Sequence, residues 1–243
     1  MGKICVVGIG PGDMENMTYR AAKAIEAADI VVGYGAYIEL IRDYFPEKEF
    51  VSSGMTREVQ RCRMALQKAQ NGLKVALVSS GDSGIYGMAG VMLQVLNESG
   101  SAIPVEIIPG VTAASAGAAL LGAPLMHDFA VISLSDLLTP WELICSRIRL
   151  ALQGDFVLCL YNPRSKKRSG YIGIAREIAM EYRSPETPVG IVRNAGRKNE
   201  GCEITSLEGM LDFEIDMFST VIIGNSATYV ENGRIITPRG YVL

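Results

Sequence analysis

The chain has 243 residues, of which 49% are hydrophobic and 20% are charged, a balance typical of a folded globular protein and not of a disordered one. Lys and Arg number 23 and Asp and Glu number 26, so the net charge is −3. That total disfavours a nucleic-acid binder, which is usually basic overall.

No apolar run approaches the roughly 18 residues that a membrane span needs, and the N-terminus lacks the long apolar stretch of a secretory signal. The five cysteines are odd in number and form no Cys-x-x-Cys pair, which favours free thiols in a reducing compartment. With a single histidine besides, we expect a cytoplasmic protein without a metal site of its own.

Short β-rich runs alternate with longer helical patterns along the chain. The expected strands are Ile4–Val7, Ile30–Val32, Val75–Val78, Val105–Ile108, Ala130–Ser133, Phe156–Tyr161, Val189–Val192 and Val221–Ile223. The expected helices are Thr18–Ala28, Glu58–Gln70, Gly87–Leu96, Ala113–Leu121, Trp141–Leu152 and Tyr171–Tyr182. This alternation predicts α/β architecture with a largely parallel sheet.

A break at residues 122–128, which contain Gly122 and Pro124, interrupts a small-residue helix before a new strand. We therefore expect two α/β domains, residues 1–125 and 126–243. No linker rich in Gly or Ser separates them, so we expect close packing with a ligand cleft between them.

A first glycine loop, Gly8-Ile-Gly10-Pro11-Gly12-Asp13, directly follows the first strand. It resembles a dinucleotide-binding loop, but Asp13 stands where the third glycine of that motif would fall. Pro11 also removes a backbone N–H that a pyrophosphate would need. A phosphate cradle is therefore disfavoured, and a plain tight turn remains the alternative.

Two more loops follow strands in the same way, Ser79–Gly87 and Pro109–Ser115. Asp82 lies at the carboxyl end of its strand, where α/β proteins bind ligands, and a carboxylate there suits a ribose hydroxyl or a cationic amine. The alternative is a helix N-cap, and Thr112 in the other loop leaves the same two choices open.

In this order and spacing, the three loops resemble those of the tetrapyrrole methylase family, the class III methyltransferases. The resemblance extends over essentially the whole chain. It implies two α/β domains, a homodimer, and S-adenosylmethionine in the cleft. By this resemblance the cofactor contacts are Pro11, Ser80, Gly81, Asp82, Ile85, Thr112, Ala113, Asn162 and Ala195.

The second half resembles one branch of the family, which methylates C17 of a precorrin-3 and contracts the macrocycle. Ser133–Trp141 is the most distinctive segment, accompanied by Tyr161-Asn162-Pro163-Arg164 and Asn194–Lys198. The form implied is the anaerobic one, acting on cobalt-precorrin-3, with cobalt present only in the substrate. The alternatives are the oxygen-dependent enzyme acting on precorrin-3B, and methylation of another corrin position.

Methyl transfer from a sulfonium to a ring carbon needs positioning more than acid–base catalysis, because the leaving group is already activated. Ring contraction, in contrast, needs proton transfer. The candidates are His127, Asp128, Asp136 and Tyr161. For His127 the alternative is a structural residue at the domain junction, and Asp136 is also a candidate cap for the helix that follows it.

The implied substrate carries many carboxylates, which arginine and lysine bind. Two basic clusters follow strands, and the candidate substrate-binding residues are Arg164, Lys166, Arg193 and Arg197. A solvated charged surface is the alternative. Two rivals outside this branch are a methyltransferase acting on a macromolecule and a non-enzymatic nucleotide-binding module. The chain's low basicity argues against an RNA substrate, and the missing third glycine argues against the nucleotide module.

Overall fold

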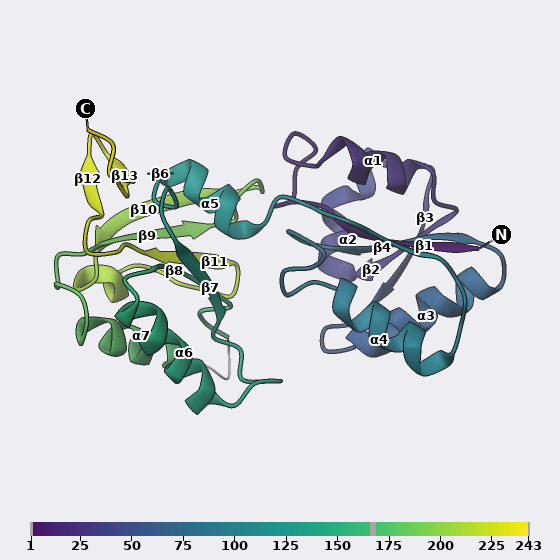
Figure 1. Cartoon of the computed structure of the whole chain (residues 1–243). Coiled ribbons are helices and arrows are strands. Elements are labelled where there is room, and N and C mark those ends of the chain that lie inside the picture. The colour runs from purple at the N-terminus through teal and green to yellow at the C-terminus, as the bar shows by residue number, and fades with distance from the viewer. Residues whose placement is uncertain (1, 166–168, 243) are drawn as a thin grey trace. The chain divides into compact units, whose positions relative to one another are not determined.

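The computed structural model describes residues 2–165 and 169–242 and divides into two compact units, Met1–Ala113 and Ala114–Leu243. Each unit is an α/β layer structure built on a five-stranded sheet (Figure 1). Within the described residues, none of the helices has the length and hydropathy to cross a membrane.

The sheet of the first unit is parallel throughout, with strand order β3-β2-β4-β1-β5. Its strands are β1 (Lys3–Gly8), β2 (Ile30–Tyr34), β3 (Glu49–Ser53), β4 (Lys74–Ser79) and β5 (Val105–Ile108). The central strands β1 and β4 are apolar and buried, as expected for strands with helices on both faces. All five carboxyl ends therefore lie at one edge.

Helices cover both faces of this sheet. They are α1 (Tyr19–Glu26), α2 (Gly35–Ile41), α3 (Glu58–Gln70) and α4 (Ala89–Ser99), with a 3-10 turn, η1 (Arg42–Tyr44). The α3 and α4 side chains pack on the face that carries Ile4 and Val6, and the α1 and α2 side chains pack on the face that carries Val7 and Val31. Thr18 caps α1 by accepting the Ala21 N–H at 3.1 Å.

The sheet of the second unit is mixed, with strand order β10-β9-β11-β8-β7. Its strands are β7 (Phe129–Ser133), β8 (Val157–Tyr161), β9 (Pro188–Arg193), β10 (Gly201–Ser206) and β11 (Ser219–Ile223). Only β7 and β8 pair in parallel, because β11 inserts between β8 and β9 and runs antiparallel to both. The expectation of a largely parallel sheet is correct for the first unit and wrong here.

In the second unit, α6 (Trp141–Gln153) and α7 (Tyr171–Met180) cover one face of the sheet, and α5 (Ala113–Leu121) covers the other. A Cβ added at Gly190 in β9 would lie 2.2 Å from Leu121 Cδ1, so glycine there lets α5 lie against the sheet. A small three-stranded sheet contains β6 (Gly122–Ala123), β12 (Tyr229–Glu231) and β13 (Arg234–Ile236). A 3-10 turn, η2 (Gly209–Asp212), precedes β11.

The boundary between the two units follows Ala113, whereas the sequence predicts a domain boundary near residue 125. The difference is due to α5. Its residues Ala114, Ala118 and Leu121 join the core of the second unit, so that unit begins at Ala114. The eight expected strands and six expected helices are all present, with ends shifted by a few residues. The sequence patterns missed the helix α2 and the strands β3, β6, β10, β12 and β13, which are short or carry exposed polar residues.

Candidate functional site

Three glycine-containing loops meet at the carboxyl ends of β1, β4 and β5 in the first unit. Gly10 and Gly81 form an isolated antiparallel bridge, in which the Gly81 N–H donates to Gly10 O at 2.7 Å and the Gly10 N–H donates to Gly81 O at 3.1 Å. Both glycines have positive φ, +74° and +67°, which L side chains rarely adopt. The first two loops therefore join through their backbones.

The third loop packs against the other two with no room for a side chain. A Cβ at Gly110 would lie 2.3 Å from Gly81 O and 2.5 Å from Gly8 O, and one at Gly8 would lie 2.7 Å from Gly110 N. All of these atoms are backbone atoms. The close approach of three backbones is thus the reason for glycine at Gly8 and Gly110.

Asp82 links the second loop to the third. Its Oδ1 accepts the N–H groups of Gly84 at 2.7 Å and Ile85 at 3.2 Å, and its Oδ2 accepts the N–H of Gly110 at 3.0 Å. Helix α4 has Met88 at its N-cap position, so the alternative role of Asp82 as that cap is wrong. A carboxylate has about four acceptor positions, and these bonds use three.

The structure brings together all of the cofactor candidates that lie in the first unit. Pro11, Gly81 and Asp82 belong to the joined loops, and Ser80, Thr112 and Ala113 are half-buried beside them. Ile85 is 40% exposed, which leaves an apolar side chain at the surface of the second loop. Asp13, which takes the place of a third glycine, accepts the backbone N–H of Asn16 at 2.7 Å and closes a turn.

In the second unit, a group of side chains lies at the carboxyl ends of β7 and β8. Ser133 pairs with Tyr161 across these strands, and the Asn162 side-chain amide donates to Ser133 Oγ at 2.9 Å. The Tyr161 hydroxyl accepts the N–H of Ala114 at 2.6 Å, which ties the first turn of α5 to the end of β8. Asn162 has a φ of +52°, a turn conformation that asparagine tolerates.

Asp136 follows β7 at the same edge. Its Oδ2 accepts the Tyr171 hydroxyl at 2.7 Å, and the Tyr171 ring stacks on Trp141 with 3.9 Å between ring centroids. Pro140 occupies the N-cap position of α6, so the suggested role of Asp136 as that cap is wrong. Tyr171 was not predicted to be a site residue. The only sequence signal was an aromatic residue within an expected helix.

The basic candidates differ in their surroundings. Arg193 ends β9 and pairs with Glu214 at 2.6 Å, Arg197 lies 5.9 Å from the Phe218 ring centroid, and Arg164 is exposed just after β8. Ala195 is half-buried in the turn after β9. Since β8 and β9 both run antiparallel to β11, these residues share the carboxyl edge with Tyr161. Lys166 lies outside the described residues.

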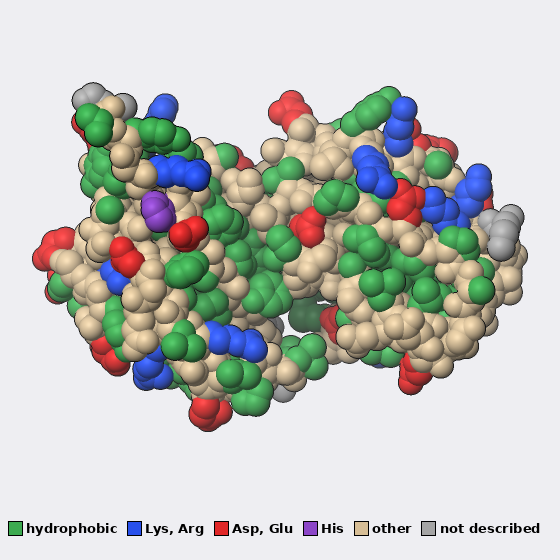
Figure 2. All heavy atoms as spheres, viewed as in Figure 1, with side chains coloured by type: hydrophobic (Ala, Val, Ile, Leu, Met, Phe, Trp, Pro, Cys, Tyr) green, Lys and Arg blue, Asp and Glu red, His purple; other side chains and the backbone are tan. Residues whose placement is uncertain are grey.

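His127 and Asp128 stand apart from this group, because they precede β7 and therefore lie at the opposite edge of the sheet. Five residues along a strand span about 16 Å, which separates Asp128 from Ser133. The His127 side chain, 46% exposed and purple in Figure 2, borders a hollow of about 330 Å³ with Asp155, Asn225 and Arg239. The Asp128 N–H donates to His127 Nδ1 at 2.9 Å.

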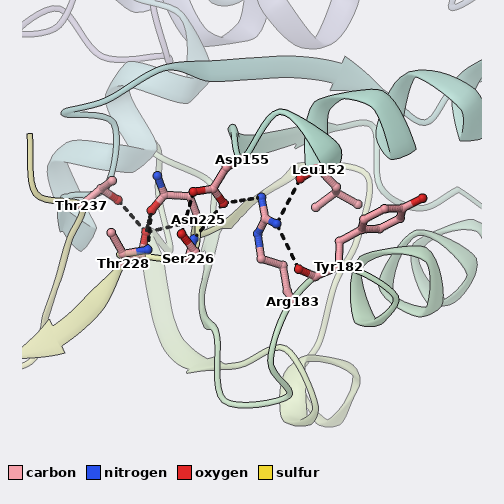
Figure 3. Close-up of polar contacts among 9 residues, drawn as sticks. Leu152, Asp155, Tyr182, Arg183, Asn225, Ser226, Thr228 and Thr237 are labelled. Atoms are coloured by element: carbon pink, nitrogen blue, oxygen red, sulfur yellow. Dashed lines mark hydrogen bonds and ion pairs between the residues drawn. The ribbon is translucent and has the colours of Figure 1, made fainter.

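Asp155 and Asn225, which line this hollow, belong to a network of polar contacts (Figure 3). Asp155 accepts from the Ser226 hydroxyl at 2.6 Å and pairs with Arg183 at 2.9 Å. Arg183 also donates to the carbonyl oxygens of Leu152 and Tyr182, each at 3.1 Å. Burial lowers the pKa of Arg183, and Asp155 opposes that shift. These bonds link the end of α6 and the residues before β8 with the residues that follow α7 and β11.

Within the described residues, His, Cys, Asp and Glu form no group of three or more that could hold a metal ion. The first unit instead offers backbone amides and one shared carboxylate, and the second offers guanidinium groups beside Tyr161 and Asp136 at one sheet edge. The chain is thus a two-unit α/β protein with joined glycine loops at the carboxyl edge of one sheet and arginines at the carboxyl edge of the other.

Comparison with known proteins gives the family. The family model of Tetrapyrrole (Corrin/Porphyrin) Methylases matches residues 3–210, and the chain belongs to this family. It is 52% identical over 241 residues to a probable cobalt-factor III C(17)-methyltransferase of Salmonella typhimurium LT2, covering 99% of this chain and 100% of that protein.

Two solved structures carry the same fold. The methyltransferase CobJ matches with a TM-score of 0.90 at 33% identity and covers 98% of this chain and 100% of that one. Uroporphyrin-III C-methyltransferase from Thermus thermophilus, complexed with S-adenosyl homocysteine, matches with a TM-score of 0.69 at 25% identity, covering 92% of this chain and 97% of that one. The α/β fold implied by the family resemblance is confirmed.

Proposed function

We propose that this chain methylates C17 of a cobalt-containing tetrapyrrole in cobalamin biosynthesis, with S-adenosylmethionine as methyl donor. The observation that carries the proposal is the 52% identity, over 99% of this chain and 100% of the relative, to a probable cobalt-factor III C(17)-methyltransferase. The relative is named for cobalt-factor III, and the sequence resemblance points to cobalt-precorrin-3, so both are substrates to test.

The joined loops of the first unit fit the proposed cofactor. Asp82 keeps one acceptor position on Oδ2 that a ribose hydroxyl can use, because its other bonds all go to loop N–H groups. Ile85 offers an apolar contact, and the half-buried Thr112 and Ala113 offer backbone groups beside it. Bound there, S-adenosylmethionine would supply an activated methyl group.

The sequence resemblance adds Pro11, Ser80, Gly81, Asn162 and Ala195 to this set. Asn162 and Ala195 lie at the carboxyl edge of the second unit, beside the residues proposed to bind substrate. The task of these side chains is to hold the methyl group and C17 about 3–3.5 Å apart and in line, which is the largest demand of such a transfer.

The carboxylates of the substrate are proposed to bind Arg164, Arg193 and Arg197 at that edge, together with Lys166. Glu214 competes for Arg193, so a substrate carboxylate must displace it or share the guanidinium. In addition, we infer a homodimer and a cytoplasmic location. The five free cysteines support a reducing compartment, and the homodimer rests on the family resemblance.

The assay is anaerobic turnover with methyl-labelled S-adenosylmethionine and either cobalt-factor III or cobalt-precorrin-3, read by mass spectrometry and NMR. One added methyl at C17 is the expected result, and a contracted ring in the same product would extend the proposal to ring contraction. Transfer only to metal-free precorrin-3B would move the protein to the oxygen-dependent reaction. No transfer to any of the three would contradict the proposal.

Asp136 and Tyr161 are proposed as the proton-transfer groups for ring contraction, because they share an edge with the substrate candidates and His127 does not. Accordingly, Asp136→Asn should lower the yield of contracted product at least about tenfold, the lower end of what a positioned acid or base contributes. His127→Ala should leave it within about threefold. The reverse pattern would return the role to His127 and Asp128.

A further inference from the structure

Two adjacent leucines project from the connection between β7 and α6. Leu137 is 67% exposed and Leu138 is 97% exposed, whereas Leu134 in the same connection is fully buried. The segment extends past the ends of the strands (Figure 1). Single exposed leucines are ordinary on protein surfaces, but Leu137 and Leu138 are consecutive, so the middle of one short connection exposes two large apolar side chains.

Both ends of this connection are fixed. At one end, the Leu134 N–H donates to Tyr161 O at 2.8 Å and the Ser135 N–H donates to Ser133 Oγ at 3.2 Å. Next along the chain, Asp136 accepts the Tyr171 hydroxyl, and the Tyr171 ring stacks on Trp141, the first residue of α6 at the other end. The leucines are therefore presented from an anchored base and not from a loose loop.

The position of the pair matters as much as its exposure. Leu137 and Leu138 follow β7 at the sheet edge where Arg164 follows β8 and Arg193 ends β9. Exposed leucines and guanidinium groups thus lie along the same edge of the sheet. A tetrapyrrole has the complementary chemistry, a broad apolar ring with carboxylates at its rim, and burying a leucine side chain against such a ring is favourable.

We propose that Leu137 and Leu138 form the apolar part of the substrate site and contact a face of the tetrapyrrole ring while the arginines of the same edge bind its carboxylates. This inference rests on the proposed function, since it takes the tetrapyrrole as the ligand. It adds a substrate-binding role for two residues of the distinctive segment Ser133–Trp141 to which the resemblance assigned no role.

The test compares Leu137→Ser/Leu138→Ser with Leu150→Ser. Leu150 is 63% exposed on α6 and serves as the matched control, because it lies away from the strand ends. The probe is cobalt-factor III, titrated anaerobically by absorbance. S-adenosylhomocysteine binding is measured by calorimetry, and mass in solution by sedimentation.

The double variant should weaken cobalt-factor III binding by about 10- to 100-fold, with S-adenosylhomocysteine affinity and mass in solution unchanged. The Leu150→Ser variant should match the wild type in all three measurements. Unchanged cobalt-factor III affinity in the double variant would overturn the proposal. A fall in mass would overturn it too, because the pair would then be a contact between two copies of the chain.

Failure of this inference is distinguishable from failure of the proposed function. If the wild type methylates C17 and the double variant binds cobalt-factor III as the wild type does, only the proposed role of Leu137 and Leu138 is overturned. If the wild type binds cobalt-factor III tightly without methylating it, the leucine site stands on the binding data and the proposed reaction falls. Absence of binding by the wild type overturns both.

Discussion

The two units hold their functional residues in different ways. In the first unit, three loops contact one another through backbone atoms, and a Cβ at Gly8 or Gly110 would lie within 2.8 Å of several of them. In the second, the residues at the sheet edge are held by side chains, such as Asn162 on Ser133 and Tyr171 on Asp136. A side chain added at these backbone contacts would force the loops apart, whereas a side-chain hydrogen bond can be removed singly at modest cost.

The largest effect should follow Gly110→Ala. The added Cβ would lie 2.3 Å from Gly81 O. Because Gly81 O is a backbone atom, no flexible side chain can move aside to relieve the clash. We expect S-adenosylhomocysteine affinity to fall more than about 100-fold and the first unit to lose about 2–4 kcal/mol of unfolding free energy. Calorimetry and hydrogen exchange measure the two effects.

Gly90→Ala is the control for that variant, because nothing lies within 4 Å of its added Cβ and α4 favours alanine over glycine. Wild-type affinity in Gly110→Ala would show that the three loops can separate, and would remove the distinction between the units.

A smaller effect should follow Asp82→Asn. An asparagine has one oxygen fewer to accept N–H groups, so either Gly110 or the Gly84–Ile85 pair loses its acceptor. We expect a loss of about 1–3 kcal/mol in the first unit and about tenfold weaker S-adenosylhomocysteine binding. Asp43→Asn, an exposed carboxylate of the same unit, should change neither value. Equal losses in both variants would assign the effect to net charge.

Tyr171→Phe tests the second unit. The variant keeps the stack on Trp141 and removes the bond to Asp136, so we expect a loss of about 1 kcal/mol. Trp141 is the only tryptophan, and its fluorescence therefore reports this unit alone during urea unfolding. A loss of more than about 3 kcal/mol in unfolding free energy would mean that the edge of the second unit tolerates substitution no better than the glycine loops do.

The smallest effect should follow Glu106→Gln, which lies in the first unit away from the loops. Hydrogen bonds from Lys3 and then Arg20 lower the pKa of Glu106, so its ion pairs stabilise the fold above the unfolded-state pKa of about 4.3. That stability is lost as the pH falls through the lower folded-state pKa.

The wild type should therefore exceed Glu106→Gln by less than about 1 kcal/mol at pH 7, because these side chains are partly exposed. The difference should shrink to nothing in acid. Glu15→Gln, which changes an exposed carboxylate, should show no such pH dependence. A difference that does not decrease as the pH falls below the unfolded-state pKa would mean that Glu106 acts through packing and not through charge.

The sequence predicted the first unit better than the second, for a physical reason. Close approach of backbones and positive φ both favour glycine, so the three loops could be recognised in the sequence from Gly8, Gly81 and Gly110. The insertion of β11 between β8 and β9 has no comparable sequence signal, because strand direction does not alter the apolar pattern of a buried strand. Side-chain partners such as Tyr171 for Asp136 depend on contacts 35 residues apart.

The mixed sheet of the second unit also has a consequence for folding kinetics. Strands β9 and β10 pair across residues 194–200 alone, a turn that includes Asn194, Gly196 and Asn199 at positive φ, and β11 pairs with β9 soon afterwards. The parallel sheet of the first unit offers no such local pairing, since each of its strand pairs must close a longer connection first. Of the two five-stranded sheets, the second therefore has the strand pairing that is entropically cheaper to begin, within residues 188–223.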